Sequence, residues 1–304
     1  MFLCQTHNMF LAENKPIITD SGPFYYSHEI TLTVRRLDLM DPVSGGNKWF
    51  KLRYNLKKFF EGNYSGILTY GGAFSNHIAA VAKAGNDFKI STLGIIRGED
   101  LSLANKTLIQ ARNNGMQLIF ISRSEYRNKY DKSFLEKIIP DYQNYFILEE
   151  GGANAEGVKG CAEILDPADN TYDHIAVACG TGTTAAGMLL AMKPGQKLIG
   201  FSILRDNGFI EKEITNWLTS LKSHNSMPLW EINHDYDFGG YAKTNDELTL
   251  FCKNFYLKTQ IQIEPVYTGK MFYGLEQLIA TGHFKPGSNI LAIHSGGMQY
   301  LIRD

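Results

Sequence analysis

Segments typical of buried strands alternate with segments of helical periodicity along most of this chain, and no other feature limits its fold so strongly. Residues 67–70 and 174–179 are short apolar runs with the length of buried strands, whereas residues 49–60 place apolar side chains at helical spacing. Strands that alternate with helices form parallel sheets with helices on both faces. We therefore expect an α/β protein, and its 304 residues are enough for two lobes.

The same criteria assign further elements. Strands are predicted over residues 67–70, 90–96, 117–121, 145–148, 174–179, 197–204 and 289–294. Helices are predicted over residues 49–60, 75–86, 102–113, 124–138, 156–165 and 183–192, and near 209–222, 245–256 and 270–280.

Glycine clusters fall where predicted strands end. The four clusters are Gly71-Gly72, Gly151-Gly152, Gly180 with Gly182, and Gly296-Gly297. Ligands of parallel α/β sheets bind at the carboxyl ends of the strands. We therefore expect the four clusters to meet at one shared cleft.

Charge and composition exclude several classes of partner. The chain has 30 Lys and Arg residues against 31 Asp and Glu residues, without a basic stripe, which argues against a nucleic-acid partner. The N-terminus lacks the pattern of a secretory signal, and no apolar run approaches the ~18 residues of a membrane span. We expect no membrane association and a cytoplasmic location.

The cysteines are far apart and form no CxxC pair, so the sequence predicts neither a metal site nor a redox pair. Buried free thiols in a reducing compartment are expected instead. The four residues are Cys4, Cys161, Cys179 and Cys252.

A lysine follows two glycines where a helix is predicted to begin. In Gly45-Gly46-Asn47-Lys48 the glycines allow a sharp bend, and Lys48 would stand beside the partial positive charge of a helix N-terminus. A cation is unfavourable there, so the pKa of Lys48 is expected to fall and its free amine to become available as a nucleophile. A surface lysine in a loop is the alternative.

Two further turns join a strand to a helix. Ser75 and Asn76 follow Gly71-Gly72 and place a hydroxyl and an amide at the mouth of the cleft, although helix capping alone explains both residue types. The run 179–187 (CGTGTTAAG) offers backbone N–H groups and hydroxyls to a phosphate monoester. It also matches the dinucleotide pattern G-x-G-x-x-A, with Asp206 near the end of the next strand. A tight turn without function is the third possibility.

Two tyrosines are further candidates for the cleft. Tyr267 stands in the run 264–270 (EPVYTGK) and Tyr241 follows two glycines, although both are also typical core tyrosines. The run 293–297 (IHSGG) is a strand end with room for a flat ligand.

In this order, the motifs resemble the family of 1-aminocyclopropane-1-carboxylate (ACC) deaminases and D-cysteine desulfhydrases, tryptophan-synthase-β-like enzymes of pyridoxal 5′-phosphate (PLP). The resemblance extends from about Arg36 to the C-terminus, and its most specific part is GGNK-x-x-K-L, followed by a GG-x-x-SN turn, a G-T-G-T loop and PVYTGK. It implies two lobes, each an open, mostly parallel twisted sheet with helices on both faces. The larger, PLP-binding lobe would comprise residues 1–49 and 154–304, and the smaller, inserted lobe residues 50–153. The resemblance also implies a homodimer.

The resemblance implies roles for matching residues. Lys48 would bind PLP as a Schiff base, and Lys51 would lie near the phosphate. Asn76 would hydrogen-bond the 3′-hydroxyl of PLP, and Ser75 would face the substrate carboxylate or move protons. The other implied site residues are Gly180, Thr181, Gly182, Thr183 and Thr184 around the phosphate, Tyr241 and Tyr267 beside the substrate, and Thr268 at the pyridine nitrogen.

Two positions and one short segment distinguish this chain within the family it resembles. Phe74 stands where family members carry Gln, and residues 36–41 replace a longer loop. Position 268 carries Glu in ACC deaminases and Thr in D-cysteine desulfhydrases. A carboxylate keeps the ring nitrogen protonated, whereas a neutral hydroxyl leaves a weaker electron sink. β-Elimination of a good leaving group needs less of a sink than opening a cyclopropane, so Thr268 favours β-elimination.

The expected reaction converts a small amino acid to a 2-oxo acid and ammonia. Lys48 would remove the α-proton, and Tyr241 or Tyr267 would protonate the leaving group or orient the carboxylate. Three alternatives stay open: an ACC deaminase, a nicotinamide oxidoreductase, and a non-catalytic PLP-binding protein in which Phe74 and the shortened loop close the pocket.

Overall fold

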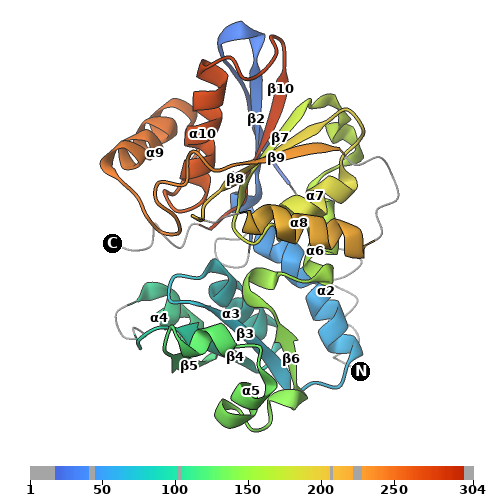
Figure 1. The fold of residues 1–304 in the computed structure, drawn as a ribbon, viewed down its shortest axis with the longest axis vertical. Helices are drawn as coiled ribbons and strands as arrows, with labels where there is room; N and C mark the ends of the chain where they lie inside the picture. The colour runs from blue at the N-terminus through green and yellow to red at the C-terminus, as the bar shows by residue number, and fades with distance from the viewer. Residues whose placement is uncertain (1–17, 41–44, 101–104, 206–207, 222–227, 298–304) are drawn as a thin grey trace.

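Two separate β-sheets organise the protein, and they confirm the predicted α/β class (Figure 1). The structure is a computed structural model that describes residues 18–40, 45–100, 105–205, 208–221 and 228–297. The six-stranded sheet has the order β1 (Asp20–Tyr25), β2 (Thr31–Arg36), β10 (Asn289–His294), β7 (His174–Cys179), β8 (Lys197–Ser202), β9 (Leu229–Asn233). The four-stranded sheet has the order β5 (Gln117–Ile121), β4 (Thr92–Arg97), β3 (Gly66–Gly72), β6 (Tyr145–Leu148).

Both sheets are parallel except at one edge, where β1 runs antiparallel to β2. Strand β10 lies in the middle of its sheet, and Ala292 pairs with Val34 on one side and with Ala176 on the other. The end of the last strand therefore lies beside the end of β2, which precedes the predicted lysine turn by only a few residues. This register brings the C-terminal ends of β2 and β10 to the same edge of the sheet.

Helices cover both faces of each sheet. They are α2 (Asn47–Glu61), α3 (Asn76–Phe88), α4 (Lys106–Asn113), α5 (Lys132–Ile138), α6 (Ala155–Cys161), α7 (Thr183–Ala191), α8 (Phe209–Ser220), α9 (Asp246–Thr259) and α10 (Thr268–Ala280). Alternate residues of one strand face opposite helical layers: Ala176 packs with α9 and α10, whereas Ile175 and Val177 pack with α6, α7 and α8. Because both faces are buried there, the interior strands β3, β4, β7 and β10 are mostly apolar rather than alternating.

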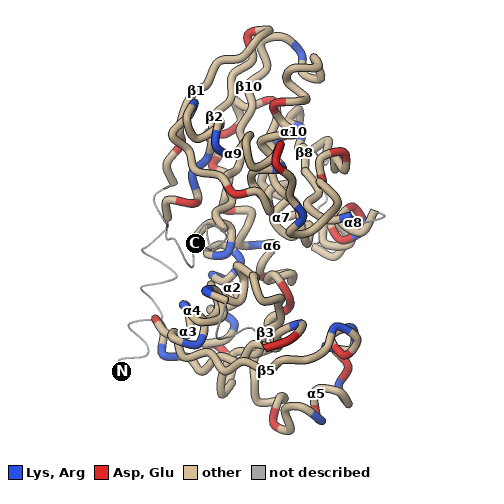
Figure 2. Tube along the Cα trace, turned by 90° about the vertical axis from the view of Figure 1, so that its left-hand side faces the viewer, with Lys and Arg blue, Asp and Glu red and all other residues tan. Residues whose placement is uncertain are grey.

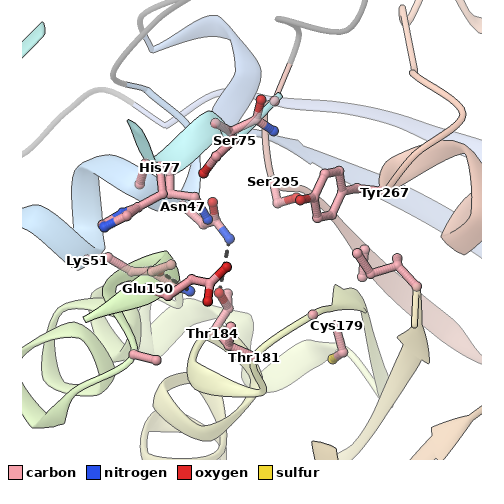
Figure 3. Close-up of a pocket in the computed structure, with 18 of the residues that line it drawn as sticks. Asn47, Lys51, Ser75, His77, Glu150, Cys179, Thr181, Thr184, Tyr267 and Ser295 are labelled. Atoms are coloured by element: carbon pink, nitrogen blue, oxygen red, sulfur yellow. Dashed lines mark hydrogen bonds between the residues drawn. The ribbon is translucent and has the colours of Figure 1, made fainter. Parts of the chain in front are cut away.

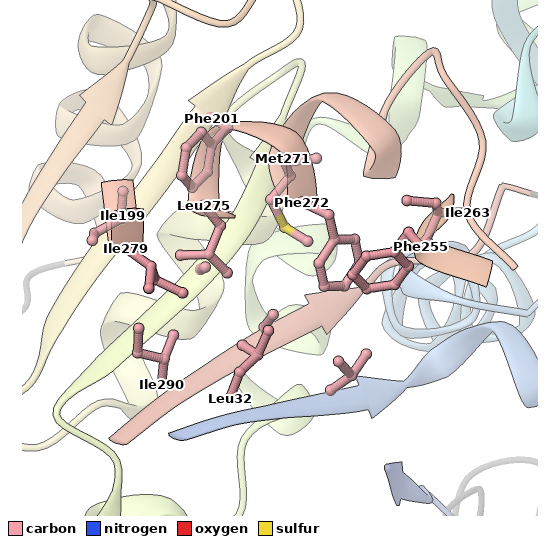
Figure 4. Packing of buried hydrophobic residues seen from close by; sticks show 14 of the residues in the cluster. Leu32, Ile199, Phe201, Phe255, Ile263, Met271, Phe272, Leu275, Ile279 and Ile290 are labelled. Atoms are coloured by element: carbon pink, nitrogen blue, oxygen red, sulfur yellow. The ribbon is translucent and has the colours of Figure 1, made fainter. Parts of the chain in front are cut away.

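The core under α9 and α10 fixes the position of α10 (Figure 4). Phe272 of α10 and Phe255 of α9 have ring centroids 4.6 Å apart, and Leu275 and Ile279 pack with Ile199 of the sheet. Burying each such side chain stabilises the fold by about 1.5–3 kcal/mol. The N-terminus of α10, which follows Tyr267, is therefore held by a large apolar cluster.

Helix α2 contributes to cores on both sides of the molecule. Phe50 packs in the cluster beneath α6 and α7, whereas Leu52, Leu56 and Phe59 pack against the four-stranded sheet. Gly160 of α6 lets the two helices touch, because a Cβ there would overlap the carbonyl oxygen of Phe50. The first turn of α2 consequently lies where the two sheets approach each other (Figure 1). The predicted lobe boundaries at residues 49/50 and 153/154 stay a prediction.

The structure corrects two helix predictions. Residues 124–138 do not form one helix: a 3₁₀ turn (Glu125–Asn128) is followed by α5, which begins afresh because the Asp131 carboxylate accepts a hydrogen bond from Phe134 N at 3.1 Å. The predicted helix 156–165 is α6 followed by a 3₁₀ turn (Ala162–Ile164).

Three strands escaped prediction, and their sequences show why. Strands β1 and β9 lie at sheet edges and bury few side chains. Strand β2 ends in two arginines, and Arg35 is buried because it forms ion pairs with Asp20 and Asp169. Because its buried arginine is polar, this strand does not match the apolar pattern by which buried strands are predicted.

Lys and Arg residues are interspersed with Asp and Glu residues along the trace of both sheets and their helices (Figure 2). Among the described residues, no helix combines the length and apolar character that a membrane span requires. Cys161, Cys179 and Cys252 are buried free thiols, and Cys4 lies outside the described residues.

Candidate active site

A cavity of about 730 Å³ lies among residues from both sheets, and all four predicted glycine clusters contribute to its lining. The glycines concerned are Gly72, Gly151, Gly180, Gly182, Gly296 and Gly297. Side chains from α2, α3 and α7 and from the turn before α10 surround it (Figure 3). The shared cleft that the sequence predicts is therefore present.

The turn before α2 is built by backbone contacts that only glycine allows. Gly46 has φ +66°, and a Cβ on it would overlap the carbonyl oxygen of Ser295. Gly46 N donates to Leu37 O, and Asn47 N donates to Ser295 O, both at 3.0 Å. The start of α2 is thus joined to the ends of β2 and β10, and Lys48 follows in its first turn.

Lys48 lines the cavity and is partly exposed. Burial, and next the positive charge of Lys51, hold the pKa of Lys48 well below its ordinary value. The direction agrees with the sequence analysis, but burial rather than the helix terminus is the largest cause. A lysine with such a pKa offers a neutral amine for attack on a carbonyl group.

Lys51 lies one turn further along α2 and also lines the cavity. Its side chain is buried, and its Nζ donates to Gly151 O at 3.0 Å. Burial lowers the pKa of Lys51 as well. A Cβ on Gly152 would lie 3.2 Å from Lys51 Cβ, so this glycine turn is packed tightly against α2. Lys51 joins α2 to the turn that follows β6.

The N-terminus of α3 supplies the next two predicted residues. Ser75 caps this helix by accepting from Ile78 N at 3.3 Å, and both Ser75 and Asn76 line the cavity. Gly297, with φ +87°, faces the Asn76 side chain, and a Cβ there would lie 2.5 Å from Asn76 Nδ2. Ser75 therefore both caps α3 and lines the cavity.

His77 is a site residue that sequence reasoning missed. It lines the cavity, is 2% exposed, and its Nε2 lies 2.9 Å from Thr69 Oγ1. The Thr69 hydroxyl donates to Leu148 O, so Nε2 of His77 is the donor to Thr69. Burial and the charges of Lys48 and Lys51 push the pKa of His77 well below its ordinary value, so the ring is neutral. A lone histidine after Ser-Asn carries no pattern that would have predicted this.

The predicted phosphate loop surrounds the N-terminus of α7. Gly182 has φ +69°, and a Cβ on it would lie 3.0 Å from Ile214 Cγ1. Asn47 Nδ2 donates to Thr184 Oγ1 at 3.0 Å, and the hydroxyls of Thr181 and Thr183 are 2.9 Å apart. Of the five predicted residues Gly180, Thr181, Gly182 and Thr184 line the cavity, whereas Thr183 lies behind them. Backbone N–H groups at a helix N-terminus bind anions, so this loop fits a phosphate.

Tyr241 and Tyr267 both line the cavity, with ring centroids 5.8 Å apart and planes at 73°. Burial, and next the neighbouring Tyr241, raise the pKa of Tyr267 well above its ordinary value. The Tyr267 backbone is held by the buried Glu264 carboxylate, which accepts from Val266 N, Tyr267 N and Thr268 N at 2.7–2.9 Å. The two tyrosines are hydroxyl donors at the cavity wall.

Thr268 is placed differently from the other predicted residues. It is fully buried, its hydroxyl is bonded to Glu264, and it is not among the residues that line the cavity. The side chain that the resemblance assigns to a pyridine nitrogen thus lies behind the wall, in the turn that carries Tyr267.

Neither Phe74 nor the described part of the shortened segment, residues 36–40, closes the cavity. Phe74 is 41% exposed and is not among the lining residues. In the shortened segment, Asp38 lines the cavity and accepts two hydrogen bonds from the Arg36 guanidinium, at 2.9 and 2.6 Å. Asp41 of that segment and Asp206 of the dinucleotide pattern lie outside the described residues.

These residues together fit a flat, phosphate-bearing aldehyde. The anion loop of α7, the neutral amine of Lys48 and the amide of Asn76 border one cavity, which is large enough for such a group and a small amino acid. The loop can bind a phosphate, the amine can react with an aldehyde, and the amide can hydrogen-bond a ring hydroxyl. PLP carries all three of these groups.

Comparisons with known proteins agree with this fit. A family model described as pyridoxal-phosphate dependent enzyme matches residues 21–296. The bifunctional D-cysteine desulfhydrase/1-aminocyclopropane-1-carboxylate deaminase of Arabidopsis thaliana, a mitochondrial protein, is 29% identical over 291 residues, covering 88% of this chain and 72% of that protein. The D-cysteine desulfhydrase of Klebsiella pneumoniae is 25% identical over 287 residues, covering 87% of this chain and 86% of that protein.

A solved structure gives the same fold. The crystal structure of an ACC deaminase homologue matches with a TM-score of 0.78 at 23% identity, covering 96% of this chain and 95% of that one. The family match includes both sheets except Asp20, and every residue of the cavity wall except Gly297. The chain therefore belongs to the family of pyridoxal-phosphate dependent enzymes, with PLP as its cofactor.

Proposed function

We propose that this enzyme deaminates a small amino acid by β-elimination, with D-cysteine as the first substrate to test. The observation that carries the proposal is that Lys48, whose pKa is lowered chiefly by burial, lines the same cavity as the anion loop and the two tyrosines. Two relatives support it, since both are named for D-cysteine desulfhydrase activity.

PLP supplies an aldehyde that condenses with amines and a ring that withdraws electrons from the α-carbon. In the proposal, Lys48 would hold that aldehyde until the substrate amine displaces it, and the freed lysine amine would then accept the α-proton. The Cα–H and Cβ–S bonds of cysteine break, sulfide leaves with a proton, and water completes the release of pyruvate and ammonia. The anion loop holds the phosphate, while Lys51 fixes the glycine turn beside it through Gly151 O.

The remaining residues orient the reactants in this proposal. Asn76 holds the ring hydroxyl, and Ser75, at the N-terminus of α3, binds the substrate carboxylate. Tyr241 or Tyr267 protonates the leaving group. The raised pKa of Tyr267 keeps the hydroxyl of that residue protonated, so it has a proton to donate. A homodimer and a cytoplasmic location also belong to the proposal; sedimentation at several concentrations tests the former.

A second candidate is an ACC deaminase, favoured by the second activity in the name of the Arabidopsis relative. The test is 2-oxo acid release by the PLP-loaded protein from D-cysteine, L-cysteine, D-serine and ACC, with Lys48→Ala as control. Release from D-cysteine that the control lacks supports the proposal. Release from ACC alone favours the second candidate. No release from any of the four contradicts both.

A further inference from the structure

Lys270 closes the PVYTGK motif and has no part in the roles discussed above. Its side chain is fully buried on the first turns of α10, and its Nζ donates to Asp237 O and Gly240 O, each at 2.7 Å. Burying a lysine is costly unless its donors are satisfied. A buried ammonium on two carbonyl groups of one loop therefore points to a specific task.

The loop that Lys270 holds has an unfavourable backbone. Phe238, Gly239, Gly240 and Ala242 all have positive φ, at +52°, +91°, +107° and +57°. Non-glycine residues in this region cost about 1–2 kcal/mol each, so the loop needs support from outside. Inside the loop, Gly240 N donates to Asp237 O at 3.0 Å, so Lys270 binds an oxygen that already closes the turn.

Tyr241 lies within this loop, between Gly240 and Ala242, and the helix that carries Lys270 begins directly after Tyr267. The two tyrosine rings meet edge to face at the cavity wall. Helix α10 is immobilised by the apolar core that includes Phe272 and Leu275, so it provides a fixed base. The only hydrogen bonds from α10 to the carbonyl groups of residues 237–240, among the described residues, come from Lys270.

We propose that Lys270 is a positioning residue that sets Tyr241 against Tyr267 at the substrate end of the cavity. The inference rests on the proposed function of the two tyrosines. Lys270 touches neither substrate nor cofactor, and acts by joining the strained loop 237–242 to the start of α10.

The test compares Lys270→Met, which keeps the volume and removes the donors, with Lys197→Met as control. Lys197 lies at the start of β8, pairs with Glu231 at 2.8 Å, and does not line the cavity. In the folded holoenzyme, Lys270→Met is expected to lower kcat/KM by about 10- to 100-fold, the range for a misplaced contact, and Lys197→Met to leave it unchanged.

A double-mutant cycle separates positioning from general stability. In a Tyr241→Phe background, adding Lys270→Met should lower kcat/KM by less than about 3-fold, because the hydroxyl that Lys270 positions is already absent. An equal loss in both backgrounds, or an unchanged kcat/KM with only a lower Tm, overturns the proposal. If Lys270→Met does not fold, Gly240→Ala disturbs the same loop from the other side, where a Cβ would lie 3.2 Å from Arg205 N, and enters the same cycle.

A measurement that needs no turnover keeps the two proposals distinguishable. Amide hydrogen exchange of the holoenzyme should accelerate in residues 237–243 of Lys270→Met and not in Lys197→Met. If the wild type deaminates no amino acid while this exchange result appears, the proposed reaction fails and the positioning of the loop stands. If exchange in residues 237–243 is unchanged, the role of Lys270 is refuted whatever the activity.

Discussion

Two walls of one cavity are held in place by different physical means. The lysine wall (Gly46, Lys48, Lys51, Ser75, Asn76) depends on close backbone approach, in which glycines let the start of α2 touch the end of β10. The tyrosine wall (Tyr241, Glu264, Tyr267, Lys270) depends on two buried charged side chains that bind backbone groups. Substitutions that create steric overlap should therefore disrupt the lysine wall. Substitutions that remove hydrogen bonds, or pH changes that alter protonation, should disrupt the tyrosine wall.

The largest expected effect separates the two lysines of the first wall. Lys48→Ala should lower kcat/KM by about 10³-fold or more, because it removes both the cofactor bond and the proton acceptor. Lys51→Ala should lower it about 10-fold and chiefly weaken PLP binding, since one hydrogen bond to Gly151 O is lost. Steady-state kinetics at saturating PLP measure kcat/KM of both variants, and a titration with PLP measures their cofactor affinity. The reverse order of losses would refute the assignment.

The steric nature of the lysine wall can be broken at Gly46. Gly46→Ala should destabilise the protein by about 3 kcal/mol or more, because a positive φ and an overlap with Ser295 O act together. The matched control is Gly195→Ala, where φ is +96° but nothing lies within 4 Å, and it should cost only about 1–2 kcal/mol. Urea unfolding measures both free energies. Equal costs would show that contact with Ser295 is unimportant.

The tyrosine wall should respond to pH through Glu264. Burial raises the pKa of Glu264 from 4.5 to about 7, so the native state binds this proton more tightly than the unfolded state. The contribution to stability is complete below pH 4.5 and is lost as the pH rises through 7, by about 3 kcal/mol.

Glu264→Gln, which cannot titrate, isolates this effect. The variant should be less stable at pH 5 by about 1–3 kcal/mol, because an acceptor becomes a donor facing backbone N–H groups. Unfolding curves between pH 5 and 8 should show the gap to the wild type narrowing as the pH rises. A constant or widening gap would contradict the raised pKa.

The smallest expected effect is a change in the pH profile of amine labelling at Lys48. Its lowered pKa means that the amine is neutral at a lower pH than that of an ordinary lysine, near 10.4. In the cofactor-free protein, acetylation of Lys48 should level off well below pH 10, whereas a free lysine derivative keeps gaining about tenfold per unit. Mass spectrometry of the labelled peptides gives the rates. A Lys48 profile that matches the free derivative would exclude the lowered pKa.

The two walls also differ in how far sequence predicts them. The lysine wall could be predicted because it consists of contiguous motifs, and Gly45-Gly46 before Lys48 already indicates a bend. The direction of the Lys48 pKa shift was predicted from the helix terminus, whereas its largest cause is burial by distant segments, which a local pattern does not show. The strand–helix alternation gave both sheets, and strand β2 was missed because its buried Arg35 is paired with distant acids.

The tyrosine wall was only half predictable. Tyr241 and Tyr267 could be named, but the hydrogen bonds of Lys270 join residues 30 and 33 positions apart in the sequence and leave no periodic trace. His77 escaped for the same reason, because its partner Thr69 lies on another element. Thr268 was expected in the cavity and instead supports its wall through Glu264.

The central claim is that Lys48 binds the cofactor, and reductive trapping tests it most directly. Borohydride treatment of the PLP-loaded protein converts the bond between lysine and cofactor into a stable secondary amine, which peptide mass spectrometry then locates. We predict the added mass on Lys48 alone, since burial lowers the pKa of its amine and the residue lines the same cavity as the anion loop. Added mass on Lys51, or on any residue other than Lys48, would contradict the account.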